Sequence, residues 1–402
     1  MKRVLVLVLV GIFAVVGAAP AVGSPQRRVD VVAEWYDVTA ATVAAAGASA
    51  QSTNSRTWAI SWLAAARAAH DVPAAQRDRA DAAVASAVHT ALTALAPARR
   101  AELDAALRTT LDRLPPGGPR DRGVADGARE AAALLAERQG DGLDPASVNA
   151  PFEVPPPAPG VWQPTPPSLT PPQQAGNRLA RPFLLARADQ FRLPPPPAVD
   201  SPRDRADVAE VRAYGAVDST VRTAAQTETA QFWFQGSLVG FTGPLRAAVT
   251  QAGGSAARRT ALVAAFHVIL VDTQIATSDT KYAYLRWRPI TAIRATADPQ
   301  WTPLHATPAH PDYPSGHSSY AGAAEAVLTA FAGPSAREPF TATSPTAPGV
   351  TRTYQRWADL TKDNVDARVW SGIHTRTADE AGAVLGGQVA RFGLARFASL
   401  LG

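Results

Sequence analysis

Residues 314–331 read Pro-Ser-Gly-His-Ser-Ser-Tyr-Ala-Gly-Ala-Ala-Glu-Ala-Val-Leu-Thr-Ala-Phe. Ser315 is a favourable helix N-cap, and the apolar run from Tyr320 to Phe331 predicts a helix that begins at this loop. The serine hydroxyl, the unobstructed backbone N–H of Gly316 and the positive end of the helix dipole all suit an anion. His317 would stand beside that anion as a general acid or base. The alternative is an ordinary turn with an N-capping serine.

Two further groups of cations and imidazoles flank this loop in the sequence. Lys281 and Arg288 precede it, and Arg368, Gly372 and His374 follow it. Only three of the 39 basic residues are lysines, so Lys281 stands out in a chain that otherwise uses arginine. An ammonium group can contact two anion oxygens, and each guanidinium adds forked donors. The three groups together predict a pocket for a tetrahedral oxyanion.

Each flanking group also has a simpler interpretation. Lys281 and Arg288 are two helical turns apart and could share one solvated helix face. Arg368 and His374 would lie on different faces of a single helix, so we expect a bend near Gly372 to bring them to one anion. A lone histidine beside an apolar segment is usually a packing residue. In the pocket, His374 would instead be a ligand of a metal oxide or a nucleophile on phosphorus.

In this order, the three groups resemble the pattern of the vanadium-dependent haloperoxidase and type 2 phosphatidic acid phosphatase superfamily. That pattern is Lys, six residues, Arg-Pro; then Pro-Ser-Gly-His; then Ser-Arg, five residues, His, three residues, Asp. The first two elements match without change. In the third, Ala367 replaces Ser, and Ala378 stands where the Asp belongs, with Asp379 next to it. A shift of one position along a helix turns the side chain by about 100° around the helix axis. Asp379 is therefore only a candidate partner of His374, and which acid orients this imidazole stays open.

The resemblance extends to the secreted bacterial haloperoxidase-like branch, through residues 287–294 and 301–313. It implies that His374 binds vanadium and that His317 is the acid–base group for peroxide. It also implies five residues that hold the vanadate oxygens: Lys281, Arg288, Ser315, Gly316 and Arg368. Phosphate would fit the same place. We therefore expect all seven residues to converge in the folded protein.

Two positions bear on which halide ion such a peroxidase would oxidise. His310 falls where bromoperoxidase-like members carry His and chloroperoxidase-like members carry Phe, and Ser278 replaces an aromatic residue or Arg. The resemblance thus implies a peroxidase that acts on hydrogen peroxide with bromide or iodide in preference to chloride. An acid phosphatase is the alternative: His374 would attack the phosphorus of a phosphate ester to give a phosphohistidine, and His317 would protonate the leaving oxygen. A non-catalytic scaffold of the same fold is a third possibility. Ala378 argues slightly for it, and the intact Lys281, Arg288, His317 and His374 argue against it.

The N-terminus has the pattern of a secretory signal peptide. Lys2-Arg3 precede an apolar run over residues 4–16 and small residues at 21–23, so we expect cleavage near Gly23 and secretion. Removal of this leader lowers the formal net charge from +5 to +3. The remaining positive charge is dispersed arginine, which argues against a nucleic-acid partner. No later segment is expected to span a membrane, and the sequence leaves the oligomeric state open.

The sequence predicts an all-α fold of helical bundles, with a Pro-rich strap between two halves. An Ala-rich helical half covers residues 24–150, a Pro-rich connector packed on the body covers 151–203, and the catalytic helical half covers 204–402. No stretch has the alternation typical of strands. Helical spacing is clearest over residues 82–95, 125–138, 205–217, 219–234, 256–287 and 318–331.

Overall fold

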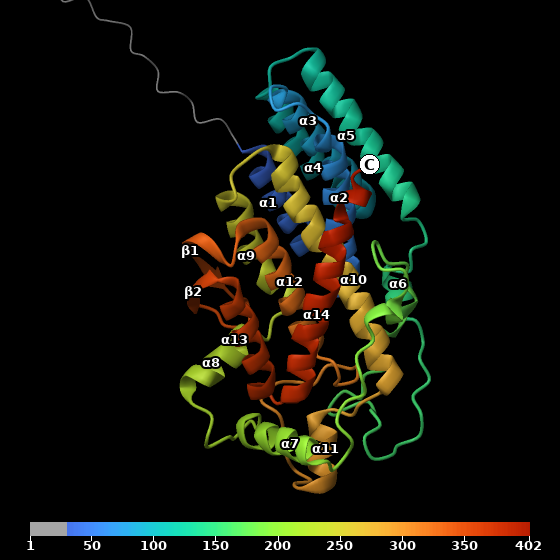
Figure 1. Ribbon diagram of the computed structural model, residues 1–402, viewed down its shortest axis with the longest axis vertical. Coiled ribbons are helices and arrows are strands. Elements are labelled where there is room, and N and C mark those ends of the chain that lie inside the picture. Colours follow the sequence, from blue (N-terminus) through green and yellow to red (C-terminus); the bar gives the residue numbers. More distant parts are fainter. Residues whose placement is uncertain (1–29) are drawn as a thin grey trace, which may run out of the picture. The chain divides into compact units, whose positions relative to one another are not determined.

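The computed structural model describes residues 30–402 (Figure 1). The expected signal peptide, residues 1–23, lies outside the described residues. Within residues 30–402 the chain forms fourteen α-helices and one two-stranded sheet. The helical-bundle fold class predicted from the sequence is confirmed.

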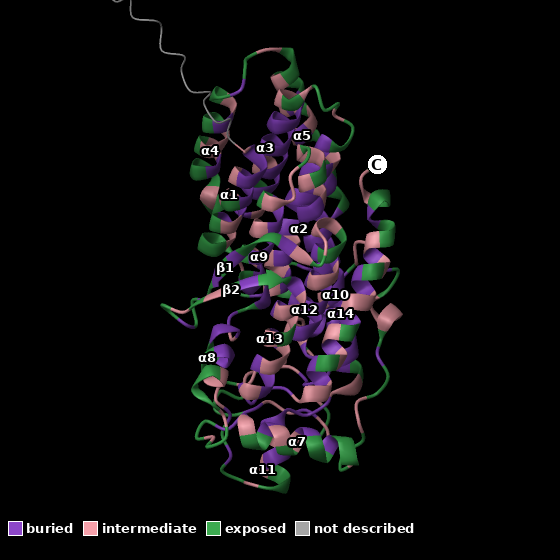
Figure 2. Ribbon diagram, turned by 60° about the vertical axis from the view of Figure 1, so that its left-hand side comes forward, coloured by how far each residue is buried: buried purple, intermediate pink, exposed green. Residues whose placement is uncertain are grey.

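The first half of the described chain is a group of Ala-rich helices: α1 (Val31–Ala46), α2 (Gln51–His70), α3 (Arg77–Leu95), α4 (Arg100–Asp112), α5 (Gly118–Glu137) and the short α6 (Pro145–Val148). Almost every residue in the middle of α2 and α3 is buried, because small alanine side chains let neighbouring helices pack closely. Trp35, Trp58 and Trp62 fill the space between these helices and are fully buried. Figure 2 shows this buried interior, with the more exposed α4 at its edge.

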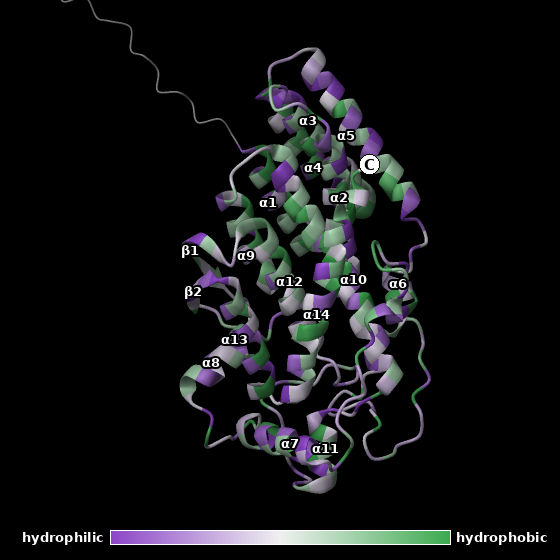
Figure 3. Cartoon of the chain, in the orientation of Figure 1, coloured by the Kyte–Doolittle hydropathy of each residue, from purple (hydrophilic) through white to green (hydrophobic). Residues whose placement is uncertain are grey.

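The second half contains the longest helix and the predicted site: α7 (Pro202–Tyr214), α8 (Ala224–Phe232), α9 (Ser237–Gln251), α10 (Ala256–Tyr284), α11 (Pro289–Thr296), α12 (Gly316–Ala332), α13 (Trp357–Trp370) and α14 (Arg376–Arg396). α10 packs against α2 of the first half and against α12 and α14 of the second (Figure 1). One hydrophobic cluster runs through both halves, from Trp58 to Leu360. Figure 3 shows the contrast between the apolar α2 and α12 and the largely hydrophilic α7. The two halves thus share one core, and the domain borders expected at residues 150 and 203 stay predictions.

By length and composition alone, α10 is the one helix among the described residues that is apolar enough to cross a bilayer. In the structure, 89% of its apolar window is buried against other parts of the protein. The apolar sequence of α10 is therefore used in core packing.

The Pro-rich segment between α6 and α7 contains two 3-10 turns, η2 (Ala175–Leu179) and η3 (Ala188–Phe191). The ring of Phe152 lies 4.7 Å from that of Tyr282 in α10, and Trp162 is fully buried. The carboxylate of Asp272 in α10 accepts three consecutive backbone N–H groups from residues 183–185, at 2.7 to 2.9 Å. This segment forms no regular helix that would pair these backbone N–H groups. The carboxylate of Asp272 accepts their hydrogen bonds instead.

Two expectations about local structure were wrong. β1 (Ser335–Thr343) and β2 (Thr351–Arg356) form an antiparallel hairpin, although no strand was predicted. The pairing has a register shift between Ser335 and Phe340, which breaks the alternation that marks a strand in sequence. Phe340 instead packs on Trp357, with 5.5 Å between ring centroids, so tertiary contact stabilises the hairpin. The helix predicted over residues 219–234 begins only at Ala224.

Candidate active site

Lys281 and Arg288 flank the turn between α10 and α11. Leu285 follows α10 with a φ of +49°, so the helix ends there, and Arg288 is the N-cap of α11. Lys281 is 4% exposed and Arg288 is fully buried, so the alternative of a solvated helix face is wrong. The Nζ of Lys281 donates to the carbonyl oxygens of Pro311 at 2.6 Å and Asp312 at 3.1 Å. This fixes the ammonium group beside the loop that precedes α12.

The Pro-Ser-Gly-His loop begins α12, as the sequence predicted. Ser315 is its N-cap, and a Cβ placed on Gly316 would lie 4.0 Å from the Cε of Lys281. The Nε2 of His317 lies 3.0 Å from the carbonyl oxygen of Gln235. A carbonyl oxygen only accepts, so Nε2 carries the ring proton and Nδ1 has the free lone pair. Gly316 and His317 are half-buried, whereas Ser315 is fully buried.

Two glycines hold this loop against α14. A Cβ on Gly382 would lie 2.5 Å from the carbonyl oxygen of Ser315, and one on Gly386 would lie 2.0 Å from that of Ser319. Both distances are shorter than atoms can approach, so only glycine permits this contact between α12 and α14. The Pro-Ser-Gly-His loop and the start of α14 are thereby held next to each other.

Arg368 and His374 come from either side of a bend after α13. Gly372 has a φ of +76°, and a Cβ there would lie 2.4 Å from the carbonyl oxygen of Gly215, so this bend requires glycine. Arg368 is 1% exposed and donates from Nη1 to the carbonyl oxygen of Trp233 at 3.1 Å. Its Nε is a buried donor without a partner among the described residues. His374 is also 1% exposed.

The acid next to His374 is Asp312. The Nδ1 of His374 lies 2.6 Å from Oδ1 of Asp312, and its Nε2 lies 3.1 Å from Nη1 of Arg288. Asp379, the candidate partner in the sequence, accepts a hydrogen bond from the hydroxyl of Ser318 at 2.8 Å. Asp379 thus lies beside the Pro-Ser-Gly-His loop. Asp312 was not singled out from the sequence, where its only signal was its place three residues before Ser315.

The two halide positions have different surroundings. Arg288 donates from Nη2 to Nδ1 of half-buried His310 at 2.9 Å and from Nε to its carbonyl oxygen at 2.7 Å. His310 is therefore joined directly to one of the three cations. Ser278 is buried, and its hydroxyl donates to the carbonyl oxygen of Gln174 in the Pro-rich segment at 2.6 Å. The described contacts of Ser278 thus lead to that segment.

The three cations are buried with too little negative charge. Burial lowers the pKa of Arg288 and of Arg368 to about 10 each. Burial, and then the charge of Arg288, lower the pKa of Lys281 well below its usual value. Burial raises the pKa of Asp379 to about 8, and it raises that of Asp312 to about 6 despite the nearby Arg288. Even if both are ionised, these two carboxyls cannot balance three cations. The site therefore favours an added anion.

The histidines respond to the same environment. Burial first, and then Arg288, Lys281 and Arg368, lower the pKa of His374 well below 6.5. Burial, followed by Arg368, does the same for His317. Both rings are neutral at pH 7, so each has a lone pair for a ligand or a proton. These mutual effects show that the residues predicted from three parts of the sequence lie in one electrostatic environment.

One wall of the site was not anticipated. The turn between α8 and α9 supplies the carbonyl oxygens of Trp233 and Gln235, which hold Arg368 and His317. Between them, the ring of Phe234 lies 5.9 Å from the guanidinium carbon of Arg368 and stacks on His305 at 4.1 Å. Backbone acceptors have no sequence signal, so the role of this turn could not be read before the fold.

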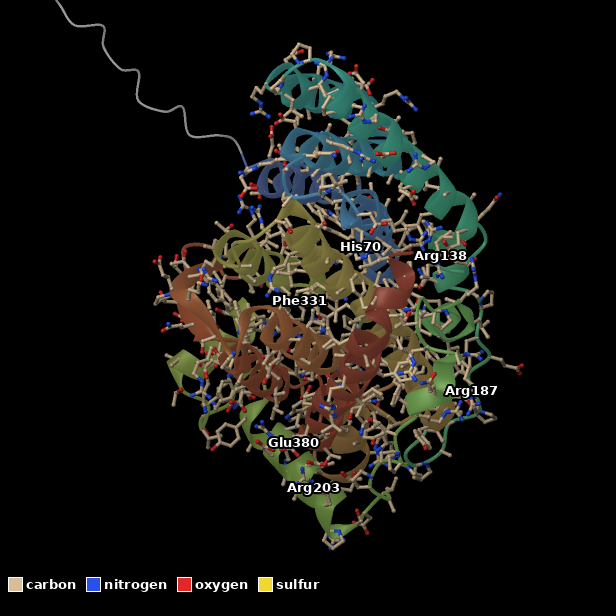
Figure 4. The ribbon with its side chains drawn as sticks, turned by 45° about the horizontal axis from the view of Figure 1, so that its top comes forward. His70, Arg138, Arg187, Arg203, Phe331 and Glu380 are labelled. Carbon is tan, nitrogen blue, oxygen red and sulfur yellow. The ribbon has the colours of Figure 1, made fainter. Side chains whose placement is uncertain are left out.

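α7 fixes the start of α14 from outside. Arg203 forms an ion pair with Glu380 at 3.1 Å, and Figure 4 shows the two residues close together. Arg376, the first residue of α14, pairs with Glu210 of α7 at 2.7 Å and with Asp366 of α13 at 2.6 Å. These contacts restrain the short loop that carries His374, so the imidazole has little freedom to move.

The donor set fits an oxyanion better than a bare metal ion. Among residues 30–402, no group of three or more His, Asp or Glu side chains could hold a metal ion. The residues gathered here are instead three cations, a serine, a glycine and two neutral imidazoles. The unpartnered Nε of Arg368 is a further donor for an oxygen atom. Vanadate or phosphate therefore fits the residues present.

Residues 261–402 match the protein family described as the VCPO second helical-bundle domain. The match covers the C-terminal bundle, from within α10 to the end of the chain, and agrees with the resemblance to the vanadium haloperoxidase and type 2 phosphatidic acid phosphatase superfamily found in the sequence. No curated protein sequence shows a significant match to the chain.

Solved structures of two members have the same fold. A bacterial vanadium-dependent iodoperoxidase superimposes with a TM-score of 0.78 at 23% identity, over 92% of this chain and 97% of the other. A bacterial vanadium-dependent chloroperoxidase in its holo form superimposes with a TM-score of 0.69 at 17% identity, over 91% and 93%. At these identities the likeness shows a shared fold over nearly the whole chain, including the N-terminal half that the family match does not reach.

Proposed function

We propose that the chain is a vanadate-dependent haloperoxidase that oxidises bromide or iodide with hydrogen peroxide. The observation that carries the proposal is the burial of Lys281, Arg288 and Arg368 close to His374 with too little negative charge to balance them. Buried cations are costly unless a partner compensates them. A bound oxyanion would provide that compensation. The two similar structures, both vanadium-dependent peroxidases, add support.

The proposal assigns a role to each side chain. The three cations would hold the oxygens of vanadate, helped by the Ser315 hydroxyl and the backbone N–H of Gly316. The Nε2 of His374 would bind the vanadium. Bound vanadate would supply the Lewis acid that activates hydrogen peroxide toward a halide ion. Overall, one halide ion, one hydrogen peroxide and one proton give one hypohalous acid and one water.

His317 is suited to accept the proton of peroxide. Its Nε2 is bound to the carbonyl oxygen of Gln235, so Nδ1 is the basic nitrogen. Its pKa is well below 6.5, because of burial and then of Arg368, so the ring is neutral at pH 7. In a phosphatase, the same ring would have to carry a proton for the leaving oxygen.

The remaining alternatives are outcomes of one experiment. The purified protein is freed of anions, reloaded with orthovanadate and assayed in parallel for bromide- or iodide-dependent peroxide consumption and for hydrolysis of an aryl phosphate. The proposal expects halide oxidation that depends on vanadate and is lost in His374→Ala. Phosphate ester hydrolysis by the vanadate-free protein, without halide oxidation by the loaded protein, would establish the phosphatase. Neither activity would favour the non-catalytic scaffold.

We also propose that the chain is exported. The support is the pattern of residues 1–23, with Lys2-Arg3 before an apolar run. The N-terminal sequence of the protein from culture medium tests this, with a start near Ser24 as the expected result.

A further inference from the structure

We propose that Asp312 positions His374, in place of the acid absent at position 378, and holds its ring in the tautomer with the proton on Nδ1. The inference rests on the proposed function of His374 as the residue that contacts the anion. It assigns the orienting acid to the loop before α12, where the superfamily pattern places it in the helix after the histidine.

The contacts of the ring define the tautomer. A guanidinium group only donates hydrogen bonds. Nη1 of Arg288 lies 3.1 Å from Nε2 of His374 and 3.4 Å from Nδ1, so Nε2 is the acceptor in the shorter contact. The ring proton is then on Nδ1 and is donated to Oδ1 of Asp312 at 2.6 Å. The Nε2 lone pair is thereby directed to the cation that would help bind the oxyanion.

Asp312 is held firmly enough for this role. Its second carboxylate oxygen accepts from the hydroxyl of Thr375 at 2.8 Å, and its backbone N–H donates to the carbonyl oxygen of Arg286 at 2.9 Å. Its own carbonyl oxygen accepts from Lys281 at 3.1 Å. Asp312 is 1% exposed, so water does not compete for these bonds. One residue therefore joins Lys281 of the first group to His374 of the third.

Positions 378 and 379 explain why the acid has to come from elsewhere. Ala378 is fully buried in a small apolar cluster that includes Tyr313 and Leu385. Asp379 is one residue further around α14 and is bound to Ser318. Neither position has a described contact with the imidazole. Without Asp312, the Nδ1 proton would be buried without an acceptor, at a cost of roughly 1–3 kcal/mol, and the other tautomer would become favourable.

The tautomer can be measured without any bound anion. The full chain is labelled with ¹⁵N-histidine, and long-range ¹H–¹⁵N correlation spectra are recorded in buffer free of phosphate and vanadate. His374 is assigned among the seven histidines by its missing signals in His374→Gln. We expect the wild type to show the proton on Nδ1 and Asp312→Ala to shift it toward Nε2. Asp379→Asn is the matched control, because it alters an equally buried carboxyl near the loop and should leave the His374 pattern unchanged.

A wild-type spectrum with the proton on Nε2 would overturn the inference, as would an unchanged His374 pattern in Asp312→Ala. Where Asp312→Ala fails to fold, Asp312→Asn keeps the side-chain shape and should reduce the Nδ1–H population. Titration with orthovanadate should show affinity reduced by roughly 10- to 100-fold in the variant, as for loss of other groups that orient a ligand histidine. A wild type with the expected tautomer and no vanadate binding would contradict the proposed function and leave the role of Asp312 supported.

Discussion

Replacement of Arg368 by glutamine is expected to weaken oxyanion binding by roughly 10- to 100-fold. The guanidinium is buried and already held by the carbonyl oxygen of Trp233, with Nε unpartnered among the described residues. An anion would therefore gain its hydrogen bonds without rearrangement. A hydrogen bond to a charged group contributes roughly 1.5–3 kcal/mol, and about 1.4 kcal/mol corresponds to a factor of ten in Kd. Glutamine keeps much of the volume of the arginine side chain. The change in vanadate affinity therefore reflects the loss of charge and hydrogen-bond donors more than a change in packing.

Isothermal titration with orthovanadate and thermal unfolding with and without it measure this effect. At a vanadate concentration of 100 times the wild-type Kd, bound ligand stabilises the native state by about 2.7 kcal/mol. A variant that binds 100-fold more weakly would gain only about 0.4 kcal/mol under the same conditions. Without vanadate the variant should be at least as stable as the wild type, because a buried charge next to Arg288 and Lys281 is removed.

Arg138→Gln is the matched control for this substitution. Arg138 is also a buried arginine, but it pairs with Asp141 and donates to the carbonyl oxygens of Arg181 and Pro182, outside the group around His374. Its loss should lower thermal stability and leave the vanadate-induced shift unchanged. Wild-type vanadate affinity in Arg368→Gln would refute the assignment of Arg368 to the anion site.

Four further predictions concern the site and the helices that carry it. His374→Ala should abolish tight vanadate binding, because the bond from Nε2 to vanadium is lost and the remaining contacts to the oxygens are weakened by salt; unchanged affinity in a titration would remove His374 from its role. His317→Ala should keep vanadate binding and lose halide oxidation, and retained peroxide turnover would exclude it as the base. His267 is buried in the middle of α10, with its ring stacked on that of Trp58 at 4.6 Å between centroids. Burial lowers its pKa to about 3, so between pH 6.5 and 3 only the unfolded state is protonated and stability falls as pH falls; in His267→Phe the urea midpoint should depend less on pH over that range, and an unaltered pH dependence would refute this. Gly386→Ala should cost roughly 1–3 kcal/mol in urea unfolding, since its Cβ would meet the carbonyl oxygen of Ser319; a neutral effect would contradict the close packing of α14.

The parts of the site that the sequence predicted depend on local chemistry. The Pro-Ser-Gly-His loop before an apolar run predicted the start of α12, since capping and periodicity act within a few residues. Gly372 predicted a bend for the same reason, and its φ of +76° agrees. The superfamily was recognisable because the spacing from Lys281 to Arg288 and the loop are unaltered in this chain.

The parts that the sequence did not predict depend on tertiary contact. Asp312 could not be chosen over Asp379, because the choice depends on which side of α14 faces the imidazole. The carbonyl oxygens of Trp233 and Gln235 are common to every residue type, so only the fold shows that they hold Arg368 and His317. The hairpin β1–β2 was missed for a similar reason, since its pairing is stabilised by packing on α13.

A crystal structure of the protein loaded with orthovanadate, with anomalous data collected at the vanadium edge, tests the central claim most directly. The account predicts one vanadium atom within coordination distance of Nε2 of His374, with its oxygens contacted by Lys281, Arg288 and Arg368. Vanadium bound elsewhere, or an imidazole turned so that Nδ1 faces the metal, would contradict it.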